Sequence, residues 1–115
     1  MDSREKAKIA VSAMEDKKAE DIRVIEISEV SSIGDYFIIC NGSNISQVQA
    51  ITDEIDERLG RQGVTAAHVE GYRNAGWILM DYSDVIIHVF DKDNRLFYNL
   101  ERIWKDGKEI DSGSL

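Results

Sequence analysis

The sequence contains no proline and only one cysteine, and both absences restrict what the chain can be. A lone cysteine, Cys40, can form neither an intrachain disulfide nor a multi-cysteine zinc site. Without proline, helices and strands must end at glycine and at polar turn residues. No apolar run approaches the length of a membrane-spanning helix, so no membrane association is expected. Residues 1–5 are polar and mixed in charge, unlike a signal or transit peptide, so the expected location is cytoplasmic.

Positive charge is also scarce, because 14 Lys and Arg residues stand against 22 Asp and Glu residues, a formal net charge of -8. An acidic protein is repelled by a phosphate backbone, so direct recognition of nucleic acid is not expected. The acidity suits a basic protein partner, and it equally suits a protein that is merely kept in solution. Composition alone leaves both interpretations open.

The length and composition predict one globular domain. The chain has 115 residues, of which 43% are hydrophobic and 31% charged. We expect a single domain over residues 1–110, followed by a flexible tail over 111–115, which is rich in serine and glycine.

The spacing of apolar residues predicts the order α-β-β-α-β-β-β-α. Helical spacing occurs over 7–14, 45–59 and 96–104. Strand patterns occur over 22–27, 35–41, 64–69, 77–82 and 85–90. Helix caps are available at Asp2 or Ser3, at 42–44, and at Asp93 or Asn94. This order favours an α/β or α+β fold, with helices packed on a mixed five-stranded sheet.

The last two strand patterns read as a hairpin with a two-residue turn at Ser83-Asp84. Strand alternation then predicts a core-like face with Ile78, Met80, Tyr82, Val85, Ile87 and Val89. The opposite face mixes apolar and polar residues, namely Trp77, Leu79, Asp81, Ile86, His88 and Phe90. Covered by a helix, Asp81 and His88 would have to pair with each other. Left open, the face would be an apolar patch with a tryptophan anchor, as protein interfaces have.

Motifs for catalysis are mostly absent: the sequence has no phosphate loop, dinucleotide fingerprint or nucleophile elbow. His68 and His88 do not have metal-ligand spacing. Gly42-Ser43, between a strand and a helix, resembles the start of a nucleotidyltransferase site, which also needs paired carboxylates on the next strand. Residues 64–69 offer no such pair. We therefore expect no enzyme activity, cofactor or metal, and keep a divergent metal-dependent nucleotidyltransferase as the alternative.

Several stretches together resemble the ribosomal silencing factor (Iojap-like) family. They run in family order and comprise 16–22, 32–37, Gly42-Ser43 with the acidic helix after it, 70–71, 77–82, 88–90 and 95–104. The resemblance implies a nucleotidyltransferase-like fold without the catalytic acids. It also implies binding to the large ribosomal subunit through ribosomal protein number fourteen, on the face that meets the small subunit. The bound protein would sterically block subunit joining and so repress translation, and the free protein is expected to form a homodimer.

The resemblance also suggests which residues contact the partner. The family's strand motifs match Trp77, Leu79, Asp81 and His88, which coincide with the mixed face of the hairpin. Tyr82 matches the same motif, although alternation assigns it to the core. Glu70 and Asp84 are expected to meet basic side chains of the partner. Tyr98, Glu101 and Trp104 match a C-terminal motif of the family.

Overall fold

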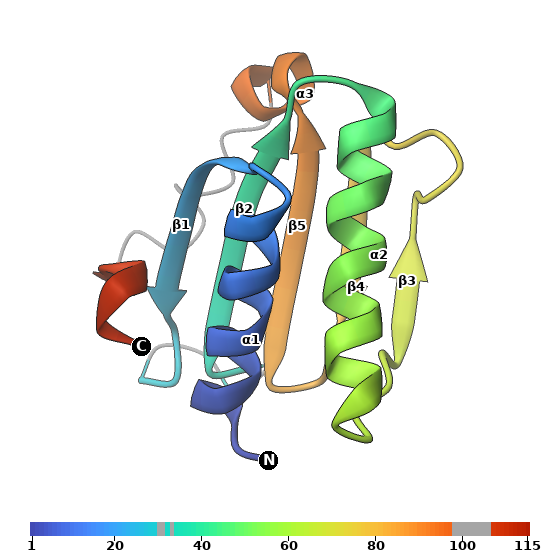
Figure 1. Cartoon of the computed structure of the whole chain (residues 1–115). Helices are drawn as coiled ribbons and strands as arrows, with labels where there is room; N and C mark the ends of the chain where they lie inside the picture. Colours follow the sequence, from blue (N-terminus) through green and yellow to red (C-terminus); the bar gives the residue numbers. More distant parts are fainter. Residues whose placement is uncertain (30–31, 33, 98–106) are drawn as a thin grey trace.

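The computed structural model describes residues 1–29, 32, 34–97 and 107–115, and it shows two helices packed on one face of a six-stranded sheet (Figure 1). The helices are α1 (Ser3–Asp16), α2 (Ile45–Arg61) and the short α3 (Lys92–Phe97), which lies at one end of the sheet. The strands are β1 (Glu20–Glu26), β2 (Tyr36–Gly42), β3 (His68–Glu70), β4 (Trp77–Asp81), β5 (Val85–Asp91) and β6 (Lys108–Ile110). A 3-10 helix, η2 (Ser112–Ser114), follows β6.

The strand order is β3-β4-β5-β2-β1-β6, so β2 and β5 form the centre of the sheet. These two strands are parallel, and every other neighbouring pair is antiparallel. All seven residues of β2 are buried. This nearly continuous apolar strand is therefore covered on both faces of the sheet.

Helix caps explain where α1 and α2 begin. The Asp2 carboxylate accepts a hydrogen bond from the Glu5 amide at 2.8 Å, and Asn44 accepts one from the Gln47 amide at 2.8 Å. Just past the end of α2, Gly63 takes a left-handed backbone with φ +79°. The caps predicted for the last helix were wrong: β5 runs directly into α3, and the side chain of Asp91 accepts from the Asn94 amide at 2.8 Å. The rest of the helix predicted over 96–104 lies mostly outside the described residues.

The predicted five-stranded sheet was also wrong, because β6 adds a sixth strand beside β1. This strand has three residues and one apolar side chain, Ile110, which is in register with Val24. So short a strand carries no alternation that could be recognised locally. The strand expected over 64–69 is shorter and later, as β3, since residues 64–67 connect α2 to the sheet edge. The mixed α+β class is confirmed, while the nucleotidyltransferase-like topology stays a prediction.

The last residues contact the domain. Asp111 accepts a hydrogen bond from the Gly113 amide at 3.0 Å, and Arg4 donates to the Ser114 carbonyl at 2.6 Å. Leu115 packs against the core. The flexibility predicted for 111–115 concerns motion and stays a prediction.

The main core lies between the sheet and the two long helices, and the hairpin contributes one whole face to it. The six residues predicted for that face are all buried, with at most 2% of any side chain exposed: Ile78, Met80, Tyr82, Val85, Ile87 and Val89. A second, smaller cluster lies on the other face of the sheet and comprises Ile25, Ile27, Phe37, Ile39 and Phe90. The sheet therefore buries apolar side chains on both faces, but unequally.

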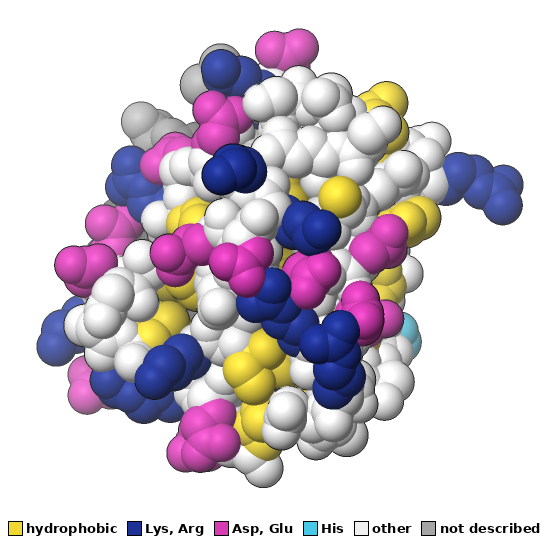
Figure 2. Space-filling model, viewed as in Figure 1, with side chains coloured by type: hydrophobic (Ala, Val, Ile, Leu, Met, Phe, Trp, Pro, Cys, Tyr) yellow, Lys and Arg dark blue, Asp and Glu magenta, His cyan; other side chains and the backbone are white. Residues whose placement is uncertain are grey.

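The helix-bearing surface carries charges of both signs, interspersed over α1 and α2 (Figure 2). Arg58 of α2 donates to Glu54 at 2.6 Å and also pairs with Asp16 of α1, which ties the two helices together. None of the helices in the described ranges is long and apolar enough to cross a membrane. With its charges paired across the surface, this side of the molecule has the pattern of a solvated face.

Candidate functional site

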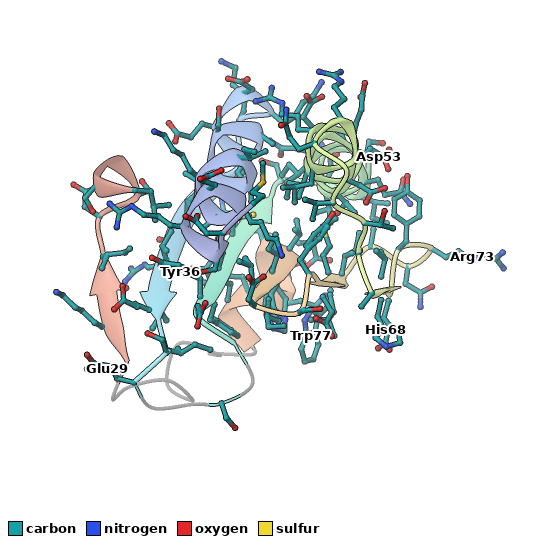
Figure 3. The ribbon with its side chains drawn as sticks, turned by 90° about the horizontal axis from the view of Figure 1, so that it is seen from below. Glu29, Tyr36, Asp53, His68, Arg73 and Trp77 are labelled. Atoms are coloured by element: carbon teal, nitrogen blue, oxygen red, sulfur yellow. The ribbon has the colours of Figure 1, made fainter. Side chains whose placement is uncertain are left out.

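We call the side of β3, β4 and β5 that points away from α1 and α2 the outer face. Strand pairing places His68 beside Asp81, Glu70 beside Leu79, Leu79 beside His88, and Trp77 beside Phe90. Figure 3 shows Trp77 and His68 projecting from the sheet on the side opposite α2, which carries Asp53. The outer face therefore unites Trp77, Leu79, Asp81 and His88, as strand alternation predicted, and it also includes Glu70, whose place in the sheet was not predicted.

Trp77 is the most prominent side chain of this face. Its ring stacks on Phe90 with centroids 5.2 Å apart, and its indole N–H donates to Nδ1 of His88 at 2.8 Å. Phe37 of the central strand lies 4.8 Å from the His88 ring. Even so, 38% of Trp77 is exposed. An aromatic side chain held from below and exposed above is the form that interface anchors take.

His88 supports Trp77 rather than facing solvent, since only 8% of it is exposed. Burial lowers the pKa of His88 to about 4, so the ring is neutral near neutral pH. With Nδ1 accepting from Trp77, the ring proton is assigned to Nε2. The sequence predicted that His88 contacts the partner directly. In the structure its ring lies beneath Trp77 and is largely buried, and direct contact with a partner stays a prediction.

Asp81 does not pair with His88, so the pairing considered from the sequence was wrong. The Asp81 carboxylate instead accepts from the Ser83 amide at 2.8 Å and stabilises the hairpin turn. Among the described residues, both long helices lie on the other face of the sheet, so neither α1 nor α2 covers Asp81 and His88. Asp81 stays partly exposed and Glu70 is exposed, so the outer face has two carboxylates around its apolar centre.

A shallow hollow of about 330 Å³ lies next to Trp77 and is lined by Glu70, Gly71, Trp77 and Leu79. It combines an aromatic ring, an aliphatic side chain and one carboxylate. Such a hollow fits an apolar side chain, or the aliphatic stem of a basic side chain whose charged end reaches Glu70.

Two predicted site residues do not share the outer face. Tyr82 is 2% exposed, and its hydroxyl donates to Asp56 of α2 at 3.1 Å. Asp84 pairs with Lys6 of α1 at 2.8 Å. Both side chains therefore turn toward the helices. His68, which was not among the predicted site residues, is exposed on the outer face beside Asp81. Strand alternation could have placed His68 on this face, but the sequence predicted the strand over 64–69 instead of β3 at His68–Glu70.

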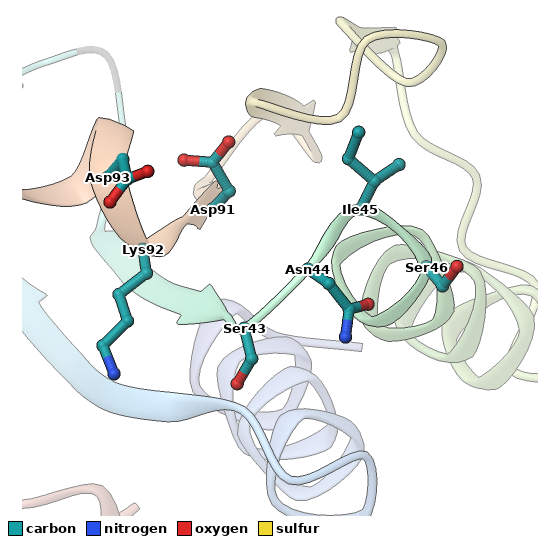
Figure 4. Close-up of a pocket in the computed structure, with 7 residues that line it drawn as sticks. All are labelled: Ser43, Asn44, Ile45, Ser46, Asp91, Lys92 and Asp93. Atoms are coloured by element: carbon teal, nitrogen blue, oxygen red, sulfur yellow. The ribbon is translucent and has the colours of Figure 1, made fainter.

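A second hollow, of about 550 Å³, lies where a nucleotidyltransferase site was considered, and Ser43 to Ser46 and Asp91 to Asp93 line it (Figure 4). Sequence reasoning missed Asp91 and Asp93 because it searched the next strand along the chain. In the sheet, parallel pairing brings Asp91 beside Gly42. One oxygen of Asp91 is engaged by the amide and side chain of Asn94. Within the described residues, no group of three or more His, Cys, Asp or Glu side chains could hold a metal ion.

Comparison with known proteins gives a consistent family. Residues 1–115 match the family model described as "Ribosomal silencing factor during starvation". The chain is 44% identical over 104 residues to the Ribosomal silencing factor RsfS of Bacillus subtilis, covering 90% of this chain and 88% of that protein. It is 41% identical over 111 residues to the protein of the same name from Halalkalibacterium halodurans, covering 96% of this chain and 95% of the relative.

Solved structures agree with the fold. The crystal structure of a Chromobacterium violaceum protein superposes with a TM-score of 0.88 at 31% identity, covering 96% of this chain and 92% of that one. The two long helices and the mixed sheet therefore belong to a fold that also occurs in an experimentally determined structure.

Proposed function

Because the chain belongs to the ribosomal silencing factor family, we propose that it represses translation by binding the large ribosomal subunit and blocking subunit joining. The contact runs through ribosomal protein number fourteen on the intersubunit face, and the outer face of the sheet makes it. The proposed place of action is the cytoplasm, where bacterial ribosomes work.

The observation that carries this proposal is the exposed, stacked tryptophan of the outer face. Trp77 is fixed by Phe90 and His88 yet 38% exposed, so little conformational entropy is lost when a partner covers it. Leu79 and the hollow beside it extend the apolar contact. Anchors of this kind contribute most of the binding energy in protein interfaces.

Charge supports the choice of a basic partner. Glu70 and Asp81 lie at the edge of the apolar centre, and the whole chain has a net charge of -8. An acidic protein approaches a basic ribosomal protein with a favourable long-range attraction, which raises the association rate. Direct contact with ribosomal RNA stays disfavoured for the same reason.

The proposed mechanism is steric and involves no chemical step. The domain measures 34 × 33 × 25 Å, so a molecule bound at the intersubunit face occupies space that the small subunit needs. The outer face is also the expected contact of the free protein with a second copy, which would protect Trp77 from solvent. Binding to the ribosome and self-association would then exclude each other.

The test is co-sedimentation of the protein with purified large subunits, followed by addition of small subunits and measurement of the joined fraction. We expect binding and a reduced joined fraction. Trp77→Ala should weaken binding by about 2 kcal/mol or more, roughly a thirtyfold increase in Kd, because an interface anchor is lost.

Ile45→Ala is the matched control, since Ile45 is 53% exposed but lies at the start of α2, away from the outer face. It should bind as the unmodified protein does. Equal binding by folded Trp77→Ala would remove the outer face from the proposal. Absence of binding by the unmodified protein would remove the silencing function itself.

The alternative enzyme function has a separate test in the second hollow. Asp91 and Asp93 are the carboxylates that line it together with Ser43. Calorimetry with Mg²⁺ and a nucleoside triphosphate, compared between the unmodified protein and Asp91→Asn, measures whether this hollow binds a metal–nucleotide complex. We expect no heat of binding from either protein.

A further inference from the structure

The loop between β3 and β4, residues 71–76, ends immediately before Trp77 and is held at both of its ends. Within the loop, the Ala75 amide donates to the Gly71 carbonyl at 3.0 Å. At its C-terminal end, the Gly76 carbonyl accepts from the Asp91 amide of β5 at 3.0 Å. Ala75 is fully buried and has φ +55°, a backbone conformation that its surroundings must impose. The backbone leading into Trp77 is therefore constrained by the loop as well as by the sheet.

Gly71 makes the closest approach between this loop and Trp77. Its φ is +83°, and a Cβ atom placed on it would lie 2.2 Å from the carbonyl oxygen of Trp77. That distance is far inside van der Waals contact with backbone, so any side chain at position 71 must displace the Trp77 peptide. Glycine is required here by space as well as by conformation.

Tyr72, near the N-terminal end of the same loop, is hydrogen-bonded to α2. Its hydroxyl donates to Asp53 at 3.0 Å, and its carbonyl accepts from the side-chain amide of Gln49 at 3.0 Å. The hydrogen bond to Asp53 raises the pKa of Tyr72, which keeps the phenol protonated and donating. Figure 3 shows Asp53 on α2 beside this loop, with Arg73 projecting away from the molecule.

We propose that Gly71 and Tyr72 are positioning residues, which hold the backbone of Trp77 in the geometry required for partner binding. This inference rests on the proposed function, because it concerns the same outer face. Phe90 and His88 restrain the Trp77 ring from below, and the loop restrains its peptide. Together they pre-organise the anchor, so that less ordering entropy is lost on binding. The hydrogen bonds of Tyr72 make helix α2, on the opposite face, part of this support.

The first experiment measures Trp77 in the free protein. The chain has two tryptophans, so a Trp104→Phe protein reports on Trp77 alone and serves as the reference. Tyr72→Phe retains the ring and removes only the donor to Asp53. We expect it to lower the fluorescence anisotropy of Trp77 and to raise its quenching by acrylamide, and Gly71→Ala to do so more strongly.

Gly63→Ala is the matched control for Gly71→Ala. Gly63, at the end of α2, has nearly the same backbone angle, φ +79°, but a Cβ atom placed on it would meet nothing within 4 Å. It carries the same left-handed cost without the collision. Its Trp77 signals should match the reference.

The second experiment measures association with large subunits. Loss of one hydrogen bond in Tyr72→Phe should reduce the population with the loop docked, and so raise Kd by about two- to tenfold. Tyr72→Phe keeps the aromatic contact, so a direct packing role for Tyr72 predicts unchanged Kd and unchanged Trp77 fluorescence.

The two experiments separate the possible failures. If Trp77 is as ordered in folded Tyr72→Phe and Gly71→Ala as in the reference, the positioning role is overturned, even where the reference protein binds subunits. Failure of Gly71→Ala to fold leaves Tyr72→Phe as the deciding variant. If the unmodified protein does not bind subunits at all, the proposed function fails, whatever the fluorescence shows.

Discussion

Strands β4 and β5 present two faces whose side chains have opposite surroundings. On the face toward α1 and α2, Ile78, Met80 and Ile87 are completely buried. On the outer face, Trp77 is exposed, Leu79 and Ile86 are partly exposed, and only His88 and Phe90 are buried. The two sets alternate along the same two strands, so they share one backbone and one hairpin turn.

The difference separates stability from recognition in adjacent residues. Side chains on the helix-covered face fill a packed core, where lost volume lowers the free energy of unfolding. Side chains on the outer face are arranged around an anchor, where lost contact lowers affinity for a partner. Substitutions on neighbouring residues should therefore affect different measurements, and the size of the contrast tests the division.

The largest expected effect is on folding, from truncation of a core residue. Ile87→Ala should lower the free energy of unfolding by about 2–5 kcal/mol, because Ile87 is fully buried in a central strand. Ile86→Ala is the matched control on the preceding residue, which points to the outer face and is only partly buried. Urea denaturation followed by circular dichroism measures both. A loss for Ile86→Ala as large as that for Ile87→Ala would contradict the division.

The next effect is a pH dependence from the buried histidine of the outer face. Burial lowers the pKa of His88 to about 4, whereas an unfolded histidine has a pKa of about 6.5. A depressed pKa means that the unfolded chain binds the proton more tightly. The contribution of neutral His88 to the free energy of unfolding is therefore fully present above pH 6.5, and it is lost as the pH falls toward 4. Between about pH 7 and about pH 5, this amounts to about 2 kcal/mol.

His88→Asn isolates this contribution from the titration of carboxylates. Asparagine can still accept from the Trp77 indole but cannot gain a proton, so the variant should lose less stability on acidification than the unmodified protein. His68→Asn, on the exposed edge strand, is the control and should keep the full pH dependence. Urea denaturation at about pH 7 and about pH 5 measures the loss of unfolding free energy for each protein. Equal slopes for His88→Asn and the unmodified protein would show that His88 is not buried in its neutral form.

Sequence reasoning predicted what depends on neighbours along the chain. The alternation over 77–90 placed each hairpin side chain on its correct face, because a period of two and a two-residue turn are local properties. The caps at Asp2 and Asn44 are local for the same reason. The grouping of Trp77, Leu79, Asp81 and His88 on one face followed directly from that register.

What was missed depends on contacts between distant segments. The pairing of Ile110 with Val24 creates β6, and the parallel pairing of β2 with β5 brings Asp91 beside Gly42. Neither leaves a periodic pattern in the sequence. Asp81 and His88 do not bond to each other: His88 accepts from Trp77, and Asp81 accepts from the turn. These hydrogen bonds depend on atomic geometry that alternation does not encode.

A smaller effect tests the placement of Tyr82 on the helix-covered face. Tyr82→Phe removes the hydrogen bond to Asp56 and should lower the free energy of unfolding by about 1 kcal/mol, while large-subunit binding stays unchanged. Burial also raises the pKa of Tyr82, so its phenol stays protonated and donating throughout the neutral range. Leu79→Ala is the opposite control, with weakened binding and a smaller stability change. Weakened binding by Tyr82→Phe would return Tyr82 to the contact residues.

The smallest effect concerns Asp84, the other predicted contact that turns toward the helices. Its ion pair with Lys6 is partly exposed, so Asp84→Asn should change the free energy of unfolding by less than about 1 kcal/mol. The backbone carbonyl of Asp84, which accepts from the amides of Asp35 and Tyr36, is retained in this variant.

Binding of Asp84→Asn to large subunits should also be nearly unchanged, in contrast to Glu70→Gln, which removes a carboxylate from the hollow beside Trp77. Measuring both variants at low and moderate salt separates contact from long-range attraction, since each removes one negative charge. Equal losses would mean that only net charge matters, whereas a larger loss for Glu70→Gln locates the contact on the outer face.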